Sequence, residues 1–334
     1  MRMTFTHKCY KLICYKRMMT DKIIQVENLV KKYKKADKNA VDGISFSVEP
    51  GEFFAFLGPN GAGKTTTISI LTTTLSKTSG EAKILGLDLE NNSSEIRRQI
   101  GIIFQKPSID LNLTAEENIR FHSVLYGLYS FAPSFKLMPK SYQDRVYSLA
   151  EIIGIKEELF KPVKSFSGGM KRKLEIIRSL MHTPKLLFLD EPTVGLDPES
   201  RRNLWQYIQA VRKEQGITVF LTTHYLEEVE DADHVCIINK GKIVADGTPD
   251  EIKKSIAKEY VLMKSDNLEK LENEVTELGY KYDIFENAVR VYTDKDSDTQ
   301  RLIGKISEDL NKLEIHKASL EDAYINIIHE TLDI

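Results

Sequence analysis

Short apolar segments bounded by glycine, proline or polar turns recur along the chain from Lys22 onward. They are four or five residues long and rich in branched or aromatic side chains, which predicts strands buried in a sheet. Five such segments occupy residues 44–48, 53–57, 100–104, 186–189 and 218–221. Between the third and the fourth, roughly over residues 114–183, apolar positions recur with helical spacing. We therefore predict an α/β domain over residues 22–254 with an inserted helical subdomain.

A different pattern runs from residue 255 to residue 334. It predicts a strand, a helix, a hairpin, a helix, a strand and a final helix, over residues 260–263, 268–278, 280–285 with 288–292, 299–310, 313–316 and 320–329. The hairpin turns at Glu286 and Asn287. The β-α-β-β-α-β order is that of a small ferredoxin-like α+β domain. We expect an accessory domain that contacts a second copy or regulates the first domain. A metal-sensing role is the alternative, although the region has no cysteine.

The composition excludes several classes of protein. The chain has 334 residues, of which 41% are hydrophobic and 29% charged, too apolar a mixture for wholesale disorder. It contains no run of about 18 apolar residues, so we expect no membrane-spanning segment. Three cysteines make neither a disulfide framework nor a metal cluster, which favours an intracellular protein. Because basic and acidic residues nearly balance, we expect no nucleic-acid-binding face.

The first residues differ from the rest in charge. Residues 1–22 contain six Lys or Arg and one acidic residue, but not the apolar stretch of a secretory signal. We expect residues 1–21 to be a disordered extension or the result of an upstream start, because Met18 and Met19 immediately precede a strand-like segment. A basic arm that contacts anionic lipid is the alternative.

A glycine-rich segment follows the apolar residues 53–57. Its sequence, GPNGAGKTT, matches G-x-x-x-x-G-K-[ST] between a strand and a helix, the context that a phosphate-binding loop requires. Backbone N–H groups of such a loop surround a polyphosphate at a helix N-terminus. We expect Lys64 to hold the β- and γ-phosphates and Thr65 to ligate Mg²⁺. The expected nucleotide-binding residues here are Gly58, Pro59, Asn60, Gly61, Ala62, Gly63, Lys64, Thr65 and Thr66.

Two adjacent carboxylates end the apolar segment LLFLDEP. A strand buried on both faces ends at the carboxyl edge of its sheet, where open α/β sheets bind their ligands. Asp190 suits Mg²⁺, through water, and Glu191 suits a general base for an attacking water. An acidic pair that only caps the following turn is the alternative, but a phosphate loop in the same chain favours the catalytic role.

The segment FSGGMKRK opens a further helix. Ser167, Gly168 and Gly169 therefore form a second anion-binding N-terminus, although one nucleotide needs only one phosphate loop. The motifs occur in the order found in the ATP-binding-cassette (ABC) ATPases, which this chain resembles. That order is phosphate loop, Gln105, FSGGM, LDEP, GLD and His224. The resemblance implies that ATP is held between two copies, with the FSGGM helix of one copy closing over the γ-phosphate held by the other.

The resemblance covers about residues 22–250 and assigns roles to four more side chains. It implies that Tyr33 stacks on adenine and that Gln105 touches Mg²⁺ or the attacking water. It also implies that His224 contacts the γ-phosphate and that Asp197 lies in the loop that crosses to the other copy. Taken singly, Tyr33 is also an ordinary strand-edge residue, His224 a helix cap, and Asp197 with the following proline a turn.

What the resemblance implies as a whole is an ATPase that powers transport. Such a subunit binds ATP and Mg²⁺, pairs with a second copy and drives separate membrane permease subunits from the cytoplasmic face of the cell membrane. The FSGGM form and the C-terminal domain with its SLEDAY segment resemble the drug- and antibiotic-exporter branch. A soluble ABC ATPase acting on the ribosome or DNA is the alternative, but those usually carry two cassettes or long coiled coils. A phosphate-loop kinase or GTPase conflicts with the FSGGM segment and with the position of His224.

Seven aromatic residues crowd the 27 positions from Phe121 to Tyr147. Aromatic side chains are enriched in the cores of protein interfaces, and in ABC ATPases the region after Gln105 receives the membrane subunit. We expect Tyr129, Phe131 and Phe135 to face that partner. Packing of these rings inside the helical subdomain is the alternative.

Overall fold

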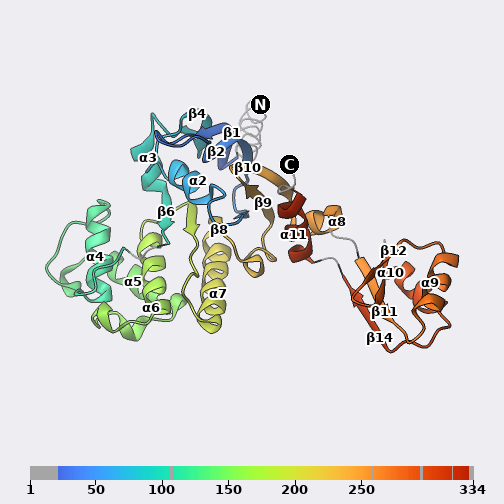
Figure 1. Ribbon diagram of the computed structural model, residues 1–334. Helices are drawn as coiled ribbons and strands as arrows, with labels where there is room; N and C mark the ends of the chain where they lie inside the picture. Colours follow the sequence, from blue (N-terminus) through green and yellow to red (C-terminus); the bar gives the residue numbers. More distant parts are fainter. Residues whose placement is uncertain (1–21, 106–107, 257–258, 294–295, 318, 331–334) are drawn as a thin grey trace, which may run out of the picture. The chain divides into compact units, whose positions relative to one another are not determined.

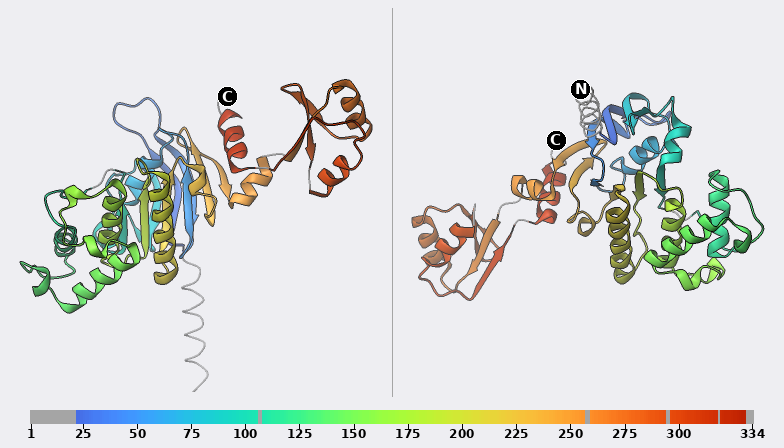
Figure 2. Two further views of the ribbon diagram at one scale, coloured as in Figure 1. Left: turned by 90° about the horizontal axis from the view of Figure 1, so that it is seen from below. Right: turned by 180° about the vertical axis from the view of Figure 1, so that it is seen from behind.

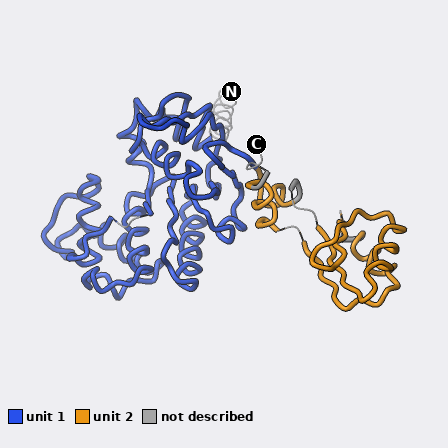
Figure 3. Tube along the Cα trace, in the orientation of Figure 1, with its two compact units in different colours: residues 1–246 blue, residues 247–334 orange. Residues whose placement is uncertain are grey.

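The computed structural model describes residues 22–105, 108–256, 259–293, 296–317 and 319–330. The chain divides into two compact units, residues 1–246 and residues 247–334 (Figure 3). The expected N-terminal extension lies outside the described residues. Among the helices that are described, none is long and apolar enough to cross a membrane.

A six-stranded sheet forms the centre of the first unit (Figure 1). Its order is β10-β9-β3-β8-β7-β6, and the strands from β9 to β6 pair in parallel. In that order the six strands span Lys242–Gly247, His234–Asn239, Phe53–Leu57, Thr218–Thr223, Leu186–Asp190 and Ile100–Ile103. Every residue of β3, β7 and β8 is buried, which is why each of these strands contains a short apolar run without polar alternation. Four of the five strands predicted from apolar segments lie in this sheet, as an α/β fold requires.

An antiparallel sheet packs against the parallel one. Its order is β2-β1-β4-β5, with strands Val41–Val48, Ile24–Lys31, Ser79–Ile84 and Leu87–Asp88. Phe46 on β2 stacks on Phe54 of β3 with ring centroids 5.5 Å apart, and both belong to one buried apolar cluster. Helix α3 (Ser93–Gln99) leads from this sheet to β6. The two sheets thus share a core, and the phosphate loop leaves β3 next to it.

The predicted helical subdomain consists of α4 (Ala115–Leu125), α5 (Lys140–Ile153) and α6 (Gly168–Leu180). These green helices lie together, away from the antiparallel sheet (Figures 1 and 2). Short 3-10 turns at Phe135–Leu137, Lys156–Glu158 and Val163–Ser165 connect them. Helix α6 contacts both α4 and α5 as well as β6 and α7 (Pro198–Gln215). It therefore joins the subdomain to the sheet.

The aromatic residues of this subdomain correct one expectation. Phe135 is buried and packs edge-on against Tyr142, Tyr147 and Phe160, so it belongs to the subdomain core. Tyr129 also packs edge-on against Tyr142, at 5.3 Å between ring centroids. Of the three rings expected at a partner surface, Phe131 alone is mostly exposed, at 59%. Although most of residues 131–140 are exposed, the 3-10 turn directs Phe135 inward.

The second unit contains the predicted β-α-β-β-α-β order. Its sheet has the order β12-β13-β11-β14, antiparallel throughout, as in a ferredoxin-like fold. The elements are β11 (Glu259–Lys264), α9 (Leu268–Glu277), β12 (Tyr282–Phe285), β13 (Ala288–Thr293), α10 (Asp296–Ile303) and β14 (Lys312–His316). Glu286 and Asn287 have φ of 48° and 60°, which gives the two-residue turn expected between β12 and β13. The helix expected to reach residue 310 ends at Ile303, before Gly304.

Two helices flank this sheet in sequence and pack on each other: α8 (Pro249–Ile256) and α11 (Leu320–Glu330). Ile252 of α8 and Ala323 and Ile327 of α11 are buried. Because α8 has its partner in the last helix of the chain, the division between the units falls after residue 246. The sequence pattern placed this division after residue 254. It predicted a strand followed by the beginning of a helix, and we interpreted both as part of the first domain.

Candidate active site

The glycine-rich segment between β3 and α2 (Lys64–Leu71) is a tight loop in which glycine is required at two positions. A Cβ atom at Gly58 would lie 2.3 Å from the carbonyl oxygen of Ile238, and one at Gly63 would lie 2.5 Å from that of Ala40. Gly63 also has φ of 113°, which side-chain-bearing residues rarely adopt. One side of the loop backbone therefore packs closely against Ile238 and Ala40, and the other side lines a cavity.

That cavity has a volume of about 480 Å³. Its walls come from the phosphate loop, from the residue before β2 and from the segments that follow β6, β7 and β8. Most of the residues expected to bind or hydrolyse a nucleotide line it: Asn60, Gly61, Gly63, Lys64, Thr65, Thr66, Gln105, Glu191 and His224. A cavity at a helix N-terminus, with backbone N–H groups and a lysine in its wall, suits a polyphosphate.

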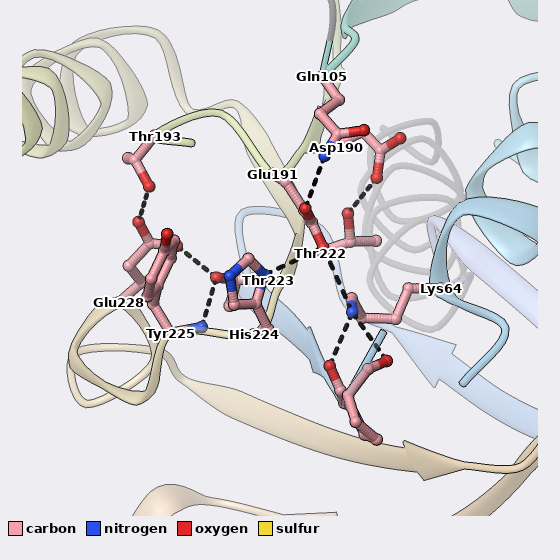
Figure 4. Close-up of polar contacts among 12 residues, drawn as sticks. Lys64, Gln105, Asp190, Glu191, Thr193, Thr222, Thr223, His224, Tyr225 and Glu228 are labelled. Carbon is pink, nitrogen blue, oxygen red and sulfur yellow. Dashed lines mark hydrogen bonds and ion pairs between the residues drawn. The ribbon is translucent and has the colours of Figure 1, made fainter. Parts of the chain in front are cut away.

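Lys64 is the cation of this cavity, and its side chain is only 4% exposed. Its Nζ donates hydrogen bonds to the carbonyl oxygens of Gly58 at 2.7 Å and Pro59 at 3.2 Å. It also lies 3.3 Å from Oε1 of Glu191 (Figure 4). Burial lowers the pKa of Lys64, and the carboxylate of Glu191 opposes that effect. The ammonium group is thus held by weak acceptors and one carboxylate, which phosphate oxygens could replace.

Glu191 lies at the centre of the charged groups. Its Oε2 accepts a hydrogen bond from Nε2 of Gln105 at 3.0 Å, and its Oε1 is 3.2 Å from Nδ1 of His224 (Figure 4). Glu191 follows the last residue of β7 and has φ of 46°, in the left-handed region, which costs about 1–2 kcal/mol for a residue other than glycine. Its backbone N–H donates to the carbonyl of Thr222 at 3.0 Å. The expected glutamine and the expected histidine therefore both contact the carboxylate of the expected base.

Asp190, the expected metal-binding carboxylate, is buried beside Glu191. Its Oδ1 accepts a hydrogen bond from Oγ1 of Thr222 at 2.6 Å, and burial raises its pKa. Among the described residues no group of three or more His, Cys, Asp or Glu could hold a metal ion. The expected set is a hydroxyl of Thr65, an amide of Gln105 and this carboxylate, and such sparse oxygen donors suit Mg²⁺, which keeps several waters and binds substrate phosphates.

The second glycine-rich helix N-terminus is built differently. Ser167 precedes α6, and its Oγ accepts a hydrogen bond from the N–H of Met170 at 3.2 Å. Gly168 is exposed, and a Cβ atom there would make an ordinary contact with the side chain of Leu196, at 3.6 Å. Asp197 caps α7 in the same way, through the N–H of Ser200 at 2.8 Å, and Ser200 abuts Gly169. The structure thus brings the FSGGM segment and the Asp197 loop together, but these residues do not line the phosphate-loop cavity.

Tyr33, the expected adenine contact, follows β1, and its side chain reaches the first turn of α2. Its hydroxyl is 3.3 Å from Oγ1 of Thr66, and its ring is 44% exposed. The Nζ of Lys31 lies 5.6 Å from the ring centroid. An exposed ring next to the phosphate loop can offer one face to a base.

Sequence reasoning missed residues that hold these side chains in place. Arg172, buried in α6, donates to the carbonyl oxygens of Phe104 at 2.6 Å and Gln105 at 2.5 Å and pairs with Glu175 at 2.7 Å. It thereby fixes the loop that carries Gln105. Thr222 and Glu228 were missed as well. The available signals were an arginine on the buried face of α6 and the paired threonines before His224.

Comparison with known proteins places this geometry among ATP-binding cassettes. The family model described as ABC transporter matches residues 41–194, and an AAA domain model matches residues 160–230. The bacitracin transport ATP-binding protein BcrA of Bacillus licheniformis is 34% identical over 312 residues, covering 92% of this chain and 97% of that protein. The probable multidrug ABC transporter ATP-binding protein YbhF of Escherichia coli is 39% identical over 231 residues, 69% of this chain but 38% of that protein, so the chain spans well under half of that relative.

A solved structure agrees with these relatives. CbiO1 from Clostridium perfringens, described as part of the ABC transporter complex cbiONQ, superposes with a TM-score of 0.62 at 27% identity. The match covers 78% of this chain and 98% of CbiO1.

Proposed function

The chain belongs to the ABC transporter family of ATP-binding proteins, and on that premise we propose that it binds and hydrolyses ATP as the nucleotide-binding subunit of a membrane exporter. The observation that carries the proposal is the cluster at Glu191. One carboxylate there contacts Lys64, Gln105 and His224 beside a phosphate loop. Phosphoryl transfer to water requires a general base, a cation that binds phosphate and groups that orient the water.

Hydrolysis would use these side chains as follows. Lys64 gives up the carbonyl oxygens of Gly58 and Pro59 and the carboxylate of Glu191 for the β- and γ-phosphate oxygens, which leaves Glu191 without its cation. Glu191 then accepts the proton of a water that Gln105 orients, as this water forms a bond to the γ-phosphorus and the bond to the β-phosphate oxygen breaks. His224 stabilises the charge on the γ-phosphate. Thr65, Gln105 and Asp190 would hold Mg²⁺, which when bound neutralises charge on the β- and γ-phosphates.

A second copy would supply the remaining contacts. Ser167, Gly168 and Gly169 form an exposed helix N-terminus that is separate from the cavity, so the phosphate it suits has to come from another molecule. The Asp197 loop adjoins the same surface. Two chains facing each other would complete two sites, with Tyr33 stacking on each adenine, and closure and opening of this dimer would drive the transport cycle. The second unit would serve as an accessory or dimer-contacting domain.

The transport role rests on the relatives. BcrA is named for bacitracin transport and YbhF for multidrug transport, which favours export of antibiotic-like molecules over action on a ribosome. The partner would be a separately encoded permease, so that the chain works at the cytoplasmic face of the cell membrane, and no nucleic acid is required.

Two assays test this function. Purified full-length chain should release phosphate from Mg²⁺–ATP, and Lys64→Met chain should not. Inverted vesicles that contain a permease which co-purifies with this chain should take up a fluorescent antibiotic only when the wild-type chain and ATP are added. Phosphate release without any ATP-dependent uptake, together with co-purification with ribosomes, would favour the soluble alternative instead.

A further inference from the structure

A buried carboxylate next to the cavity connects two of the cavity's walls. Glu228 ends the 3-10 turn η4 (Leu226–Glu228) and is 5% exposed. One of its oxygens, Oε1, accepts a hydrogen bond from Oγ1 of Thr193, and the other, Oε2, accepts from Oγ1 of Thr223 at 2.5 Å (Figure 4). Both threonines are completely buried. Each carboxylate oxygen thus has its own hydroxyl donor, from a different segment of the chain.

The two threonines are next to the residues expected to act on the nucleotide. Thr193 is two residues after Glu191, and Thr223 immediately precedes His224. On the other side of Glu191, Thr222 donates its hydroxyl to Asp190 at 2.6 Å and accepts the N–H of Glu191 at 3.0 Å. The ends of β7 and β8 are therefore joined before Glu191, and the segments that follow these strands are joined after it.

Glu191 needs such support because its backbone conformation is unfavourable. With φ of 46° a glutamate relaxes toward the common regions unless its neighbours are fixed. The 3.2 Å distance between Glu191 and His224 also depends on how the two segments align. A buried carboxylate contributes little to stability compared with an apolar side chain of the same size, so geometric definition is the better explanation for its presence.

We propose that Glu228 is a positioning residue for ATP hydrolysis, which holds the segments of Glu191 and His224 in the alignment that the reaction needs. The inference rests on the proposed ATPase function. Both hydroxyl partners of Glu228 lie outside the phosphate loop. Removing the carboxylate should therefore spare ATP binding while turnover is lost. A carboxylate that merely supported folding would weaken both and lower the melting temperature.

The test uses full-length chain with Glu228→Ala, Glu228→Gln and a control. Glu228→Ala should lower kcat about tenfold or more, since small misplacements of catalytic groups cost up to about 100-fold, while the Kd for ATP stays within about twofold. Glu228→Gln keeps one acceptor and gains one donor, and a threonine hydroxyl can accept, so it should restore most of the turnover. Glu116→Ala is the control, because Glu116 is also buried and accepts a hydroxyl, from Tyr142 at 3.0 Å, but lies in the helical subdomain.

The outcomes separate the possible roles. Glu116→Ala should lower the melting temperature and leave kcat nearly unchanged at 20 °C. Wild-type kcat in Glu228→Ala, or equal losses of kcat, affinity and melting temperature, would overturn the positioning role. If Glu228→Ala does not fold, Thr223→Val decides: it should lose turnover, Thr223→Ser should retain it, and equal turnover in both would contradict the proposal. A wild-type chain that neither binds nor hydrolyses ATP would refute the proposed function itself, and this role with it.

Discussion

Two helices of the first unit begin at glycine-rich segments, and their surroundings differ. Helix α2 begins beside a cavity of about 480 Å³, where Lys64 and Glu191 are buried together. Helix α6 begins at the surface, where Ser167 caps it and Gly168 is exposed with room for a Cβ atom. The first N-terminus has a cation, a carboxylate and a histidine within reach of a bound phosphate. The second offers N–H groups and a hydroxyl, which can bind an anion but cannot accept a proton from water at neutral pH.

From this difference we expect each terminus to be half of a site. If both belonged to one nucleotide, they would line one cavity, and among the described residues they do not. A surface terminus suits a ligand that another molecule presents, and in the proposed dimer a second copy of the chain would present a phosphate at its own α2. We therefore expect changes at α2 to act within one chain and changes at α6 to act on the neighbouring chain's site.

Removing the base should have the largest effect. Glu191→Gln should reduce ATP turnover by about 10²–10⁴-fold, because the amide cannot accept the proton, while ATP binding persists. An ATP-bound dimer should accumulate, which gel filtration with ATP and Mg²⁺ detects. A chain that stays monomeric and keeps normal turnover would contradict the assignment of the base.

Removing the cation should act earlier, on binding. Lys64→Ala should weaken ATP binding by about 100-fold, because loss of one partner of a buried charged contact costs about 2–5 kcal/mol. Lys173→Ala, on α6, is the matched control, since its Nζ contacts the hydroxyl of Tyr207 at 3.2 Å and not the cavity. Nucleotide titration of isolated chains compares them, and unchanged affinity of Lys64→Ala would mean that residues 58–66 are not the phosphate site.

The glycines should respond differently to a methyl group. Gly63→Ala should lower the free energy of unfolding by about 2–4 kcal/mol, because φ of 113° and the carbonyl of Ala40 both oppose a Cβ. Gly168→Ala should change it by less than about 1 kcal/mol, since the nearest atom is 3.6 Å away and alanine favours a helix. Urea unfolding measures both, and similar values for the two variants would remove the distinction between the termini.

The smallest expected effect is loss of the cap on α6. Ser167→Ala should cost about 1 kcal/mol of stability, or a decrease of about 2–4 °C in melting temperature, because the N–H of Met170 loses its acceptor. ATP binding by the isolated chain should not change, whereas ATP-driven dimerisation should weaken. Calorimetry measures the loss of stability, and light scattering measures the weaker dimerisation. Weaker ATP binding by the isolated chain would place Ser167 in its own chain's site.

Some of this architecture follows from the sequence alone and some does not. Strands β3, β7 and β8 are predictable because each contains a short apolar run, and the phosphate loop because its glycines and Lys64 lie within one short motif. The contacts of Glu228 are not predictable, since they join segments 35 and 5 residues away that only the parallel sheet brings together. Phe135 illustrates the same limit, because an interrupted helix says nothing about the direction in which a 3-10 turn points a ring.

The most direct test of a site shared between two chains is a mixture of two inactive variants. Ser167→Arg chain keeps an intact phosphate loop, and Lys64→Ala chain keeps an intact FSGGM segment. A mixed dimer then contains one complete site, so an equal mixture should recover about a quarter of wild-type turnover at equal total protein. Turnover no higher than that of either variant alone would contradict a nucleotide site composed of residues from two copies.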